Sequence, residues 1–337
     1  MLQGTILLVG GYGMVGRWTT HFIRSAYPDI PLLIAGRSLT KAQEWAAEIG
    51  NAQGLEADLS APDLGIGDRS ISAVATLFMD DSVAALRFAQ SRCVPHISIS
   101  PGIFELGPEV AAYIHNPNAA PVVLGTEWLV GATTVTTLEF AKAFRSVHSL
   151  VIGALLDEQD DFGPAADIDL ERQTKAMPVA LARRDCAFYW RKGADAKAVF
   201  HAVDGTEMEA SALSPNDVLG LSTVLDIPNV QFNLAIGESS SRRRGEPVST
   251  EIIIELEGED HAGQALRTRH AIVHPKGQMP LTGLGVALIL ERLAGLDGRP
   301  APLPGLYFPF QLLETSAYFD RLRQAGGRVL TLEPYLP

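Results

Sequence analysis

A glycine-rich turn near the N-terminus is the feature that most limits how this chain can fold. Thr5–Gly10 (TILLVG) is a short, continuous aliphatic run, typical of a parallel strand that is buried on both faces. The segment Gly10–Gly16 (GGYGMVG) follows, and Arg17–Tyr27 then places apolar residues at helical spacing. A strand, a glycine turn and a helix in this order predict the start of a doubly wound α/β sheet.

The glycines of this turn have the spacing GxGxxG, on Gly11, Gly13 and Gly16. The first permits the tight turn, the second lets the backbone approach a pyrophosphate, and the third lets helix and strand pack closely. The free N–H groups and the positive dipole end of the following helix favour an anion there. We therefore predict a dinucleotide site, the alternative being a glycine turn without a ligand. Its predicted turn residues are Gly11, Tyr12, Gly13, Met14, Val15 and Gly16.

The choice of dinucleotide depends on the residues after the second predicted strand, Leu32–Ala35. An NAD site usually has Asp or Glu there, whereas this chain has Arg37 and Ser38. A guanidinium and a hydroxyl suit a 2′-phosphate, so NADP is favoured over NAD, although arginine also stacks on adenine. FAD is disfavoured because flavoenzymes of this fold usually carry an acidic residue at the Arg37 position.

Three further residues complete the predicted cofactor site. Asp58 ends the third strand, where it either accepts from the adenine amino group or caps the next helix. Leu77 and Phe78 end the strand predicted at Ser72–Phe78, at the edge of the sheet where such cofactors bind.

The pattern of elements changes after Ser149. Strands and helices alternate before that point, which predicts parallel βαβ units. Later strands lack intervening helices, which favours a mixed or antiparallel sheet. The expected fold is a Rossmann doubly wound parallel sheet with a second α+β domain. Residues 1–130 and 280–337 are assigned to the dinucleotide-binding domain, and residues 131–279 to a substrate and dimerisation domain.

The order of these motifs resembles the saccharopine dehydrogenase (saccharopine reductase) family. The similar segments are VGGYGMVG, IAGRSLTKAQEWAAEIG, EADL and HISISPGIFELGPEV, with TGLGVALILERLAG and GLYFPFQLLE near the end. The resemblance implies an oxidoreductase that reduces an imine, or runs the reverse oxidation, and closing helices that return to the nucleotide domain. The family has a GLDPG-like turn where this chain has Glu127–Gly131, and Leu129 stands in place of its Asp, which indicates a more apolar pocket.

Hydride transfer needs few side chains, since the cofactor carries the chemistry. Asp80 and Glu127 follow predicted strands and are the candidate acid/base residues. The strong alternative is that Asp80 or Asp81 simply starts the helix containing Ser82–Arg92, since carboxylates favour helix N-termini. His96 begins a buried strand and is interpreted as structural. A substrate that arrives as the protonated iminium needs no acid residue from the protein.

Composition excludes several other functions. A net charge of −12 argues against nucleic-acid binding, and Arg242–Arg244 is interpreted as a solvated loop. Two distant cysteines and no ~20-residue apolar run predict a cytoplasmic protein with no disulfide and no membrane span. The histidines show no metal-binding spacing, so no metal is expected. We expect an NADP-dependent oxidoreductase that acts on a small imine, carbonyl or amine and forms a homodimer; the alternative is a non-catalytic NADP(H) redox sensor.

Overall fold

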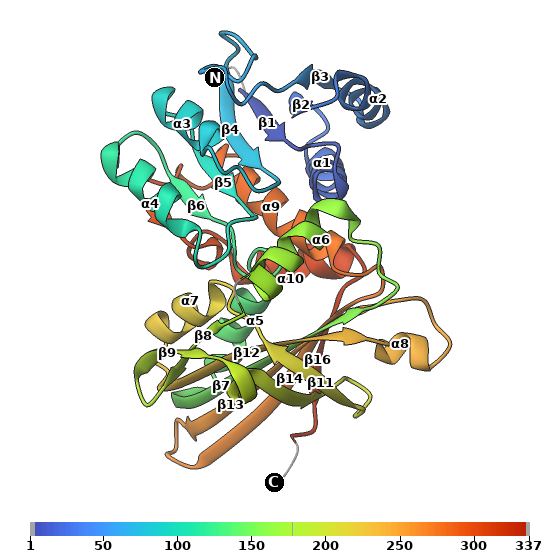
Figure 1. Ribbon diagram of the computed structural model, residues 1–337, viewed down its shortest axis with the longest axis vertical. Helices are drawn as coiled ribbons and strands as arrows, with labels where there is room; N and C mark the ends of the chain where they lie inside the picture. Colours follow the sequence, from blue (N-terminus) through green and yellow to red (C-terminus); the bar gives the residue numbers. More distant parts are fainter. Residues whose placement is uncertain (1–3, 177, 335–337) are drawn as a thin grey trace. The chain divides into compact units, whose positions relative to one another are not determined.

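The computed structural model describes residues 4–176 and 178–334, which form two compact units (Figure 1). The first unit comprises Met1–Val130 and Thr282–Glu314, and the second comprises Gly131–Leu281 and Thr315–Pro337. Each unit is built on one β-sheet, parallel in the first unit and mixed in the second. The predicted α/β class is therefore confirmed.

The sheet of the first unit has seven parallel strands in the order β15-β6-β5-β4-β1-β2-β3. Its strands are β1 (Thr5–Val9), β2 (Leu32–Gly36), β3 (Ala52–Glu56), β4 (Ile71–Thr76), β5 (His96–Ser98), β6 (Val122–Leu124) and β15 (Leu306–Tyr307). β1 pairs with β2 on one side and with β4 on the other, so the strand order reverses at β1. Open α/β sheets bind their ligands outside the carboxyl ends of the strands at such a reversal.

In the described part of the first unit, five α-helices accompany this sheet. They are α1 (Met14–Ala26), α2 (Leu39–Ile49), α3 (Ala84–Ser91), α4 (Leu106–His115) and α9 (Met279–Leu293), which enters this unit at Thr282. A Cβ built on Gly283 would lie 2.5 Å from Cβ of Trp18, so α9 approaches α1 at a distance that only glycine permits. The sequence did not predict α4.

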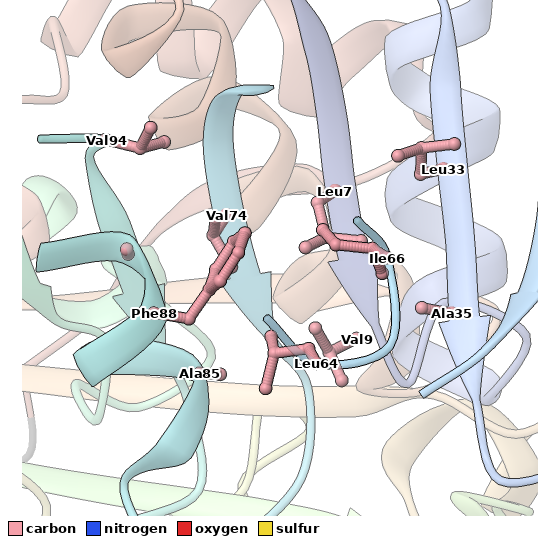
Figure 2. Packing of buried hydrophobic residues seen from close by; sticks show 11 residues of the cluster. Leu7, Val9, Leu33, Ala35, Leu64, Ile66, Val74, Ala85, Phe88 and Val94 are labelled. Carbon is pink, nitrogen blue, oxygen red and sulfur yellow. The ribbon is translucent and has the colours of Figure 1, made fainter. Parts of the chain in front are cut away.

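One face of the sheet forms a continuous apolar core under α3 (Figure 2). Alternate residues of β1 and β2 point to this face, as the two-residue period of a strand requires. Phe88 of α3 lies over Val74 of β4, and both side chains are almost completely buried. The buried members are Leu7, Val9, Leu33, Ala35, Leu64, Ile66, Val74, Ala85, Phe88, Ala89 and Val94.

The second unit is built on a mixed nine-stranded sheet whose main path is β10-β11-β12-β7-β13-β14-β16, with β8 and β9 attached through β12. Its strands are β7 (Phe144–Asp157), β8 (Ala180–Arg184), β9 (Ala187–Arg191), β10 (Lys197–His201), β11 (Glu207–Ala212), β12 (Asn229–Gly237), β13 (Thr250–Asp260), β14 (Ala265–His274) and β16 (Arg328–Leu332). β7 and β12 pair in parallel, and the other pairings of the described strands are antiparallel.

The helices of this unit are α5 (Ala132–Ala141), α6 (Gly163–Glu171), α7 (Asp217–Val224), α8 (Ser240–Arg243) and α10 (Thr315–Gln324). A π-helical turn at Arg172–Ala176 continues α6, and short 3-10 turns lie at Gly193–Ala196 and, in the first unit, Pro309–Gln311. In the part of the chain that the structure describes, no helix combines the length and apolar character that a membrane span needs.

The C-terminal segment corrects the predicted assignment of residues 280–337 to the dinucleotide-binding domain. From Thr315 onward the chain belongs to the second unit. β16 pairs with β14 from Arg269↔Leu332 to Val273↔Arg328, and α10 contacts α5. Tyr318 of α10 is fully buried there, so this segment completes the sheet and core of the second unit.

The prediction that Arg242–Arg244 forms a solvated loop is also wrong. Arg242 pairs with the buried carboxylate of Asp157 at 2.9 Å, and Arg243 pairs with Asp204 at 2.7 Å. Arg244 pairs with Glu246 at 3.1 Å. The three charges are therefore neutralised within the molecule, two of them by carboxylates that are distant in sequence.

The apolar core under α3 predicts a large cost for removing a side chain from β1. Leu7 is 0% exposed, whereas Leu303 of the same unit is 77% exposed. We expect Leu7→Ala to lower the free energy of unfolding of the first unit by about 2–5 kcal/mol, through lost burial and the cavity that remains. Hydrogen exchange of the β1, β2 and β4 amides measures this value. Leu303→Ala is the matched control, and an equal effect of both changes would contradict the proposed core.

Candidate functional site

The turn between β1 and α1 depends on close contact between two glycines. A Cβ on Gly16 would lie 2.5 Å from the carbonyl carbon and oxygen of Gly11, so α1 crosses the turn at backbone contact. A Cβ on Gly13, by contrast, would meet only the Gly10 oxygen, at 3.2 Å. Gly13 is the N-cap of α1, no described side chain caps that helix, and its first turn is without acidic residues. The backbone is thus open where an anion would approach it.

Tyr12 joins this turn to the end of β2. Its ring lies against Gly36, where a Cβ would be 2.4 Å from Cε1 of the tyrosine. The backbone N–H of Ser38 donates to the Tyr12 hydroxyl at 3.2 Å. The ends of β1 and β2 are therefore held together by a contact that requires glycine at position 36, a role that the sequence analysis missed.

Arg37 and Ser38 follow β2 directly, as predicted. Arg37 is exposed, and among the described residues no hydrogen bond or ion pair engages its guanidinium. The Ser38 hydroxyl accepts from the Lys41 N–H at 3.4 Å and caps α2. The structure thus leaves a cationic fork accessible beside the glycine turn.

Leu77 and Phe78 lie on the other side of the glycine turn. The Leu77 N–H donates to the carbonyl of Val9 at 2.9 Å, which ties the end of β4 to β1. A Cβ on Gly10 would lie 3.1 Å from Cδ1 of Phe78 and 3.3 Å from Cβ of Leu77. Residues predicted from three separate segments therefore meet at one edge of the parallel sheet.

Asp58 follows β3 and is exposed. Its Oδ1 accepts from the N–H and the hydroxyl of Ser60 at 2.9 and 2.6 Å, and these hydrogen bonds hold the pKa of Asp58 below its usual range. The chain from Leu59 to Ser70 forms turns and no helix, so the alternative that Asp58 caps a following helix is wrong. Asp58 closes a local turn instead.

The two candidate acid/base residues have different surroundings. Asp80 lies in the loop before α3, where its carboxylate accepts from the N–H groups of Ser82 at 3.1 Å and of Ala85, in the first turn of the helix, at 3.0 Å. Glu127 follows β6 and is 3% exposed. Its carbonyl accepts from Val130 N–H at 2.9 Å in a turn where Leu129, Val130 and Gly131 all have positive φ. Consecutive left-handed residues are costly and are typical of functional loops.

A buried titratable cluster near the ends of β4 and β5 includes a residue that the sequence analysis did not find. His96 lies 2.9 Å from the Thr76 hydroxyl, and burial lowers its pKa to about 4, so it is neutral at pH 7. Glu109 of α4 is 5% exposed, and burial raises its pKa to about 7; the Ser98 hydroxyl opposes this shift and the Asp80 charge adds to it. Glu109 and Asp80 line a cavity of about 230 Å³.

The second unit contains a separate, larger cavity of about 870 Å³. It lies over β10, β11 and β12 and is bordered by α6, and its volume is within the range of small-molecule sites. Val199 and Ile236 line it and are 53% and 52% exposed, so it is an open groove. Within residues 4–176 and 178–334, no group of His, Cys, Asp or Glu side chains is arranged to hold a metal ion.

Comparisons with known proteins identify the fold. No protein-family model and no curated protein matches the sequence. Saccharopine dehydrogenase (L-Glu forming) from Saccharomyces cerevisiae is similar in structure, with a TM-score of 0.63 and 14% identity over 98% of this chain and 100% of that one. Homospermidine synthase from Legionella pneumophila, solved in complex with NAD, has a TM-score of 0.65 and 10% identity over 99% and 92%. The chain therefore has the saccharopine dehydrogenase-like fold that its motifs indicate.

The raised pKa of Glu109 predicts a pH-dependent effect of its replacement. Burial raises the pKa of Glu109 to about 7 in the folded protein, against 4.5 in the unfolded chain, so the free energy of unfolding falls as the pH rises from 4.5 to 7 and the full cost is present above pH 7. We expect Glu109→Gln to raise the free energy of unfolding at pH 8 by up to about 3 kcal/mol, an increment that shrinks between pH 7 and 4.5. Urea unfolding at a series of pH values measures it. Exposed Glu56→Gln should show no such trend, and a constant increment for Glu109→Gln would contradict the assignment.

Proposed function

We propose that this protein is an NADP-dependent oxidoreductase that transfers hydride between the nicotinamide and a small imine, carbonyl or amine. The observation that carries the proposal is the edge of the parallel sheet where the open backbone at Gly13 lies near the accessible Arg37. The two are linked through Tyr12 and the end of β2. The saccharopine dehydrogenase-like fold supports an oxidoreductase, since the similar synthase was solved with NAD.

The residues of this edge fit a nicotinamide dinucleotide. The N–H groups at the start of α1 would hold the pyrophosphate, because Gly13 leaves the approach clear and no described side chain occupies the helix end. Arg37 and Ser38 would hold the 2′-phosphate, while Leu77 and Phe78 would bound the site on the β4 side. When bound, the nicotinamide supplies the hydride chemistry.

Glu127 is our candidate for the side chain that would donate or accept the proton of the substrate at the nicotinamide end of the site. It is buried in a turn of positive-φ residues that follows β6, at the same carboxyl edge of the sheet. Asp80 is less suited because its carboxylate already accepts from the first turn of α3. His96 is neutral at pH 7 and carries no proton to donate as a cation. A substrate that arrives as an iminium would need only orientation from the chain.

The alternative is a non-catalytic NADP(H) sensor. It is supported by the engagement of Asp80 in the start of α3, which leaves fewer side chains for proton transfer. Turnover separates the two proposals, because a sensor binds NADPH but does not oxidise it in the presence of any imine or ketone. Homodimerisation and a cytoplasmic location stay predictions from the sequence, and sedimentation of the purified protein tests the former.

Replacement of Arg37 tests the cofactor. We expect Arg37→Ala to weaken NADPH binding roughly 10- to 100-fold, because a charge-assisted contact with phosphate is lost, and to leave NADH binding unchanged. Titration of nicotinamide fluorescence measures both affinities. Arg87→Ala, which removes an exposed arginine of α3 in the same unit, is the control. Equal affinity of the unmodified protein for NADPH and NADH would rule out the 2′-phosphate role.

Replacement of Glu127 tests the proposed chemistry. We expect Glu127→Gln to lower kcat for imine reduction roughly 10²- to 10⁴-fold, the usual contribution of a positioned acid or base. NADPH affinity should not change, because the residue lies at the reacting end. Oxidation of NADPH, followed at 340 nm with a panel of cyclic imines and ketones, provides the measurement. An unchanged kcat would remove Glu127 from proton transfer and favour substrates that are already protonated.

A further inference from the structure

The hydroxyl group of Tyr12 has a fixed position at the start of α2. The Ser38 N–H donates to it at 3.2 Å, and Ser38 is the N-cap of that helix. The tyrosine ring lies against Gly36, where a Cβ would be 2.4 Å from Cε1 and 3.0 Å from the hydroxyl oxygen. The phenol is therefore held by backbone contacts from two residues and needs no ligand to fix its position.

This hydroxyl has a donor function that the protein leaves unused. A tyrosine hydroxyl can accept a hydrogen bond and can also donate one. The Ser38 N–H uses the acceptor function, and within residues 4–176 and 178–334 no group accepts the Tyr12 proton. Tyr12 is only partly buried, so an acceptor from outside the chain can reach the residue.

The charged side chains at the start of α2 are positive. Arg37 precedes the N-cap and Lys41 lies in the first turn, and both are exposed. Among the described residues, no hydrogen bond or ion pair engages either side chain. The first turn of α2 has no acidic residue, and Glu44 and Glu48 come later in the helix. Two cations beside a hydroxyl donor match the charge and the acceptor oxygens of a phosphate monoester.

We propose that the Tyr12 hydroxyl donates a hydrogen bond to the 2′-phosphate of NADP(H) and so helps the protein to select that cofactor over NAD(H). The inference rests on the proposed cofactor and adds to its selectivity a side chain from the glycine turn. A hydrogen bond to a charged acceptor contributes more than one to a neutral acceptor. The hydroxyl therefore favours a phosphate over the ribose hydroxyl that NAD(H) has in its place. Arg37 supplies the charge, whereas Tyr12 supplies a donor of fixed position.

The Tyr12 hydroxyl also has a structural role, because it accepts from Ser38 and ties the end of β2 to the glycine turn. This role does not depend on the cofactor, since loss of the hydrogen bond would loosen the end of β2 whichever dinucleotide is bound. A role in selectivity, by contrast, changes the affinity for NADPH and not the affinity for NADH. The ratio of the two affinities therefore separates the two roles.

Fluorescence titration of the full chain with NADPH and with NADH tests the proposal in the Tyr12→Phe variant. This variant keeps the ring on Gly36 and removes only the hydroxyl group. We expect NADPH to bind about tenfold more weakly and NADH to bind as before, because the lost hydrogen bond has a charged acceptor. Tyr113→Phe, which removes the hydroxyl of a partly buried tyrosine of α4 in the same unit, is the matched control and should leave both affinities unchanged.

Two nucleotides extend the test to the phosphate group alone. Adenosine 2′-monophosphate and its 5′ isomer have the same composition and differ only in the position of the phosphate. When each is used to displace NADPH, Tyr12→Phe should weaken the binding of the 2′ isomer about tenfold and leave that of the 5′ isomer unchanged. An equal loss of affinity for NADPH and NADH, or for both isomers, would leave only the structural role and overturn the proposal.

The Arg37→Ala variant distinguishes failure of this inference from failure of the proposed function. If the preference for NADPH is lost in Arg37→Ala but kept in Tyr12→Phe, the NADP assignment stands and the role of Tyr12 is overturned. If the unmodified protein binds NADPH no better than NADH, the NADP assignment is overturned and the inference falls with it.

Discussion

The first unit depends on the backbone contact between Gly11 and Gly16, because this contact sets the position of α1 against the sheet. Any side chain at Gly16 would overlap the carbonyl group of Gly11. The same approach places Tyr12 on Gly36 and so ties the end of β2 to the turn, while Leu77 and Phe78 reach it from β4. The candidate cofactor site is therefore a consequence of how tightly one helix packs on one strand.

The polar side chains near the strand ends differ in their surroundings, and these surroundings decide their roles more than residue type does. Asp58 and Asp80 are each satisfied by donors within a few residues, which makes them parts of the local backbone architecture. Glu109 and His96 are buried, and burial shifts both toward their neutral forms, the acid upward and the base downward in pKa. Strongly shifted pKa values of this kind cluster at functional sites.

Local signals in the sequence were sufficient for the strand–turn–helix start of the first unit, although they did not reveal α4. The apolar run of β1, the glycine spacing and the position of Arg37 all depend on residues that are close in the chain. Glu109 could not be found in this way, because it is buried by tertiary packing whereas Glu105, four residues earlier, is only partly covered. β10 and β11 alternate covered and exposed residues without a continuous apolar run, and the partners of Arg242 and Arg243 lie far away in sequence. Such features arise only when distant segments meet.

The segment from Thr315 to the end of β16 has a consequence for biosynthesis. β14 lacks one neighbour until Arg328–Leu332 has been made, and α5 lacks the covering helix that carries Tyr318. The sheet of the second unit is therefore incomplete until this segment has been made and has paired. Until then the exposed strand is open to pairing with other chains.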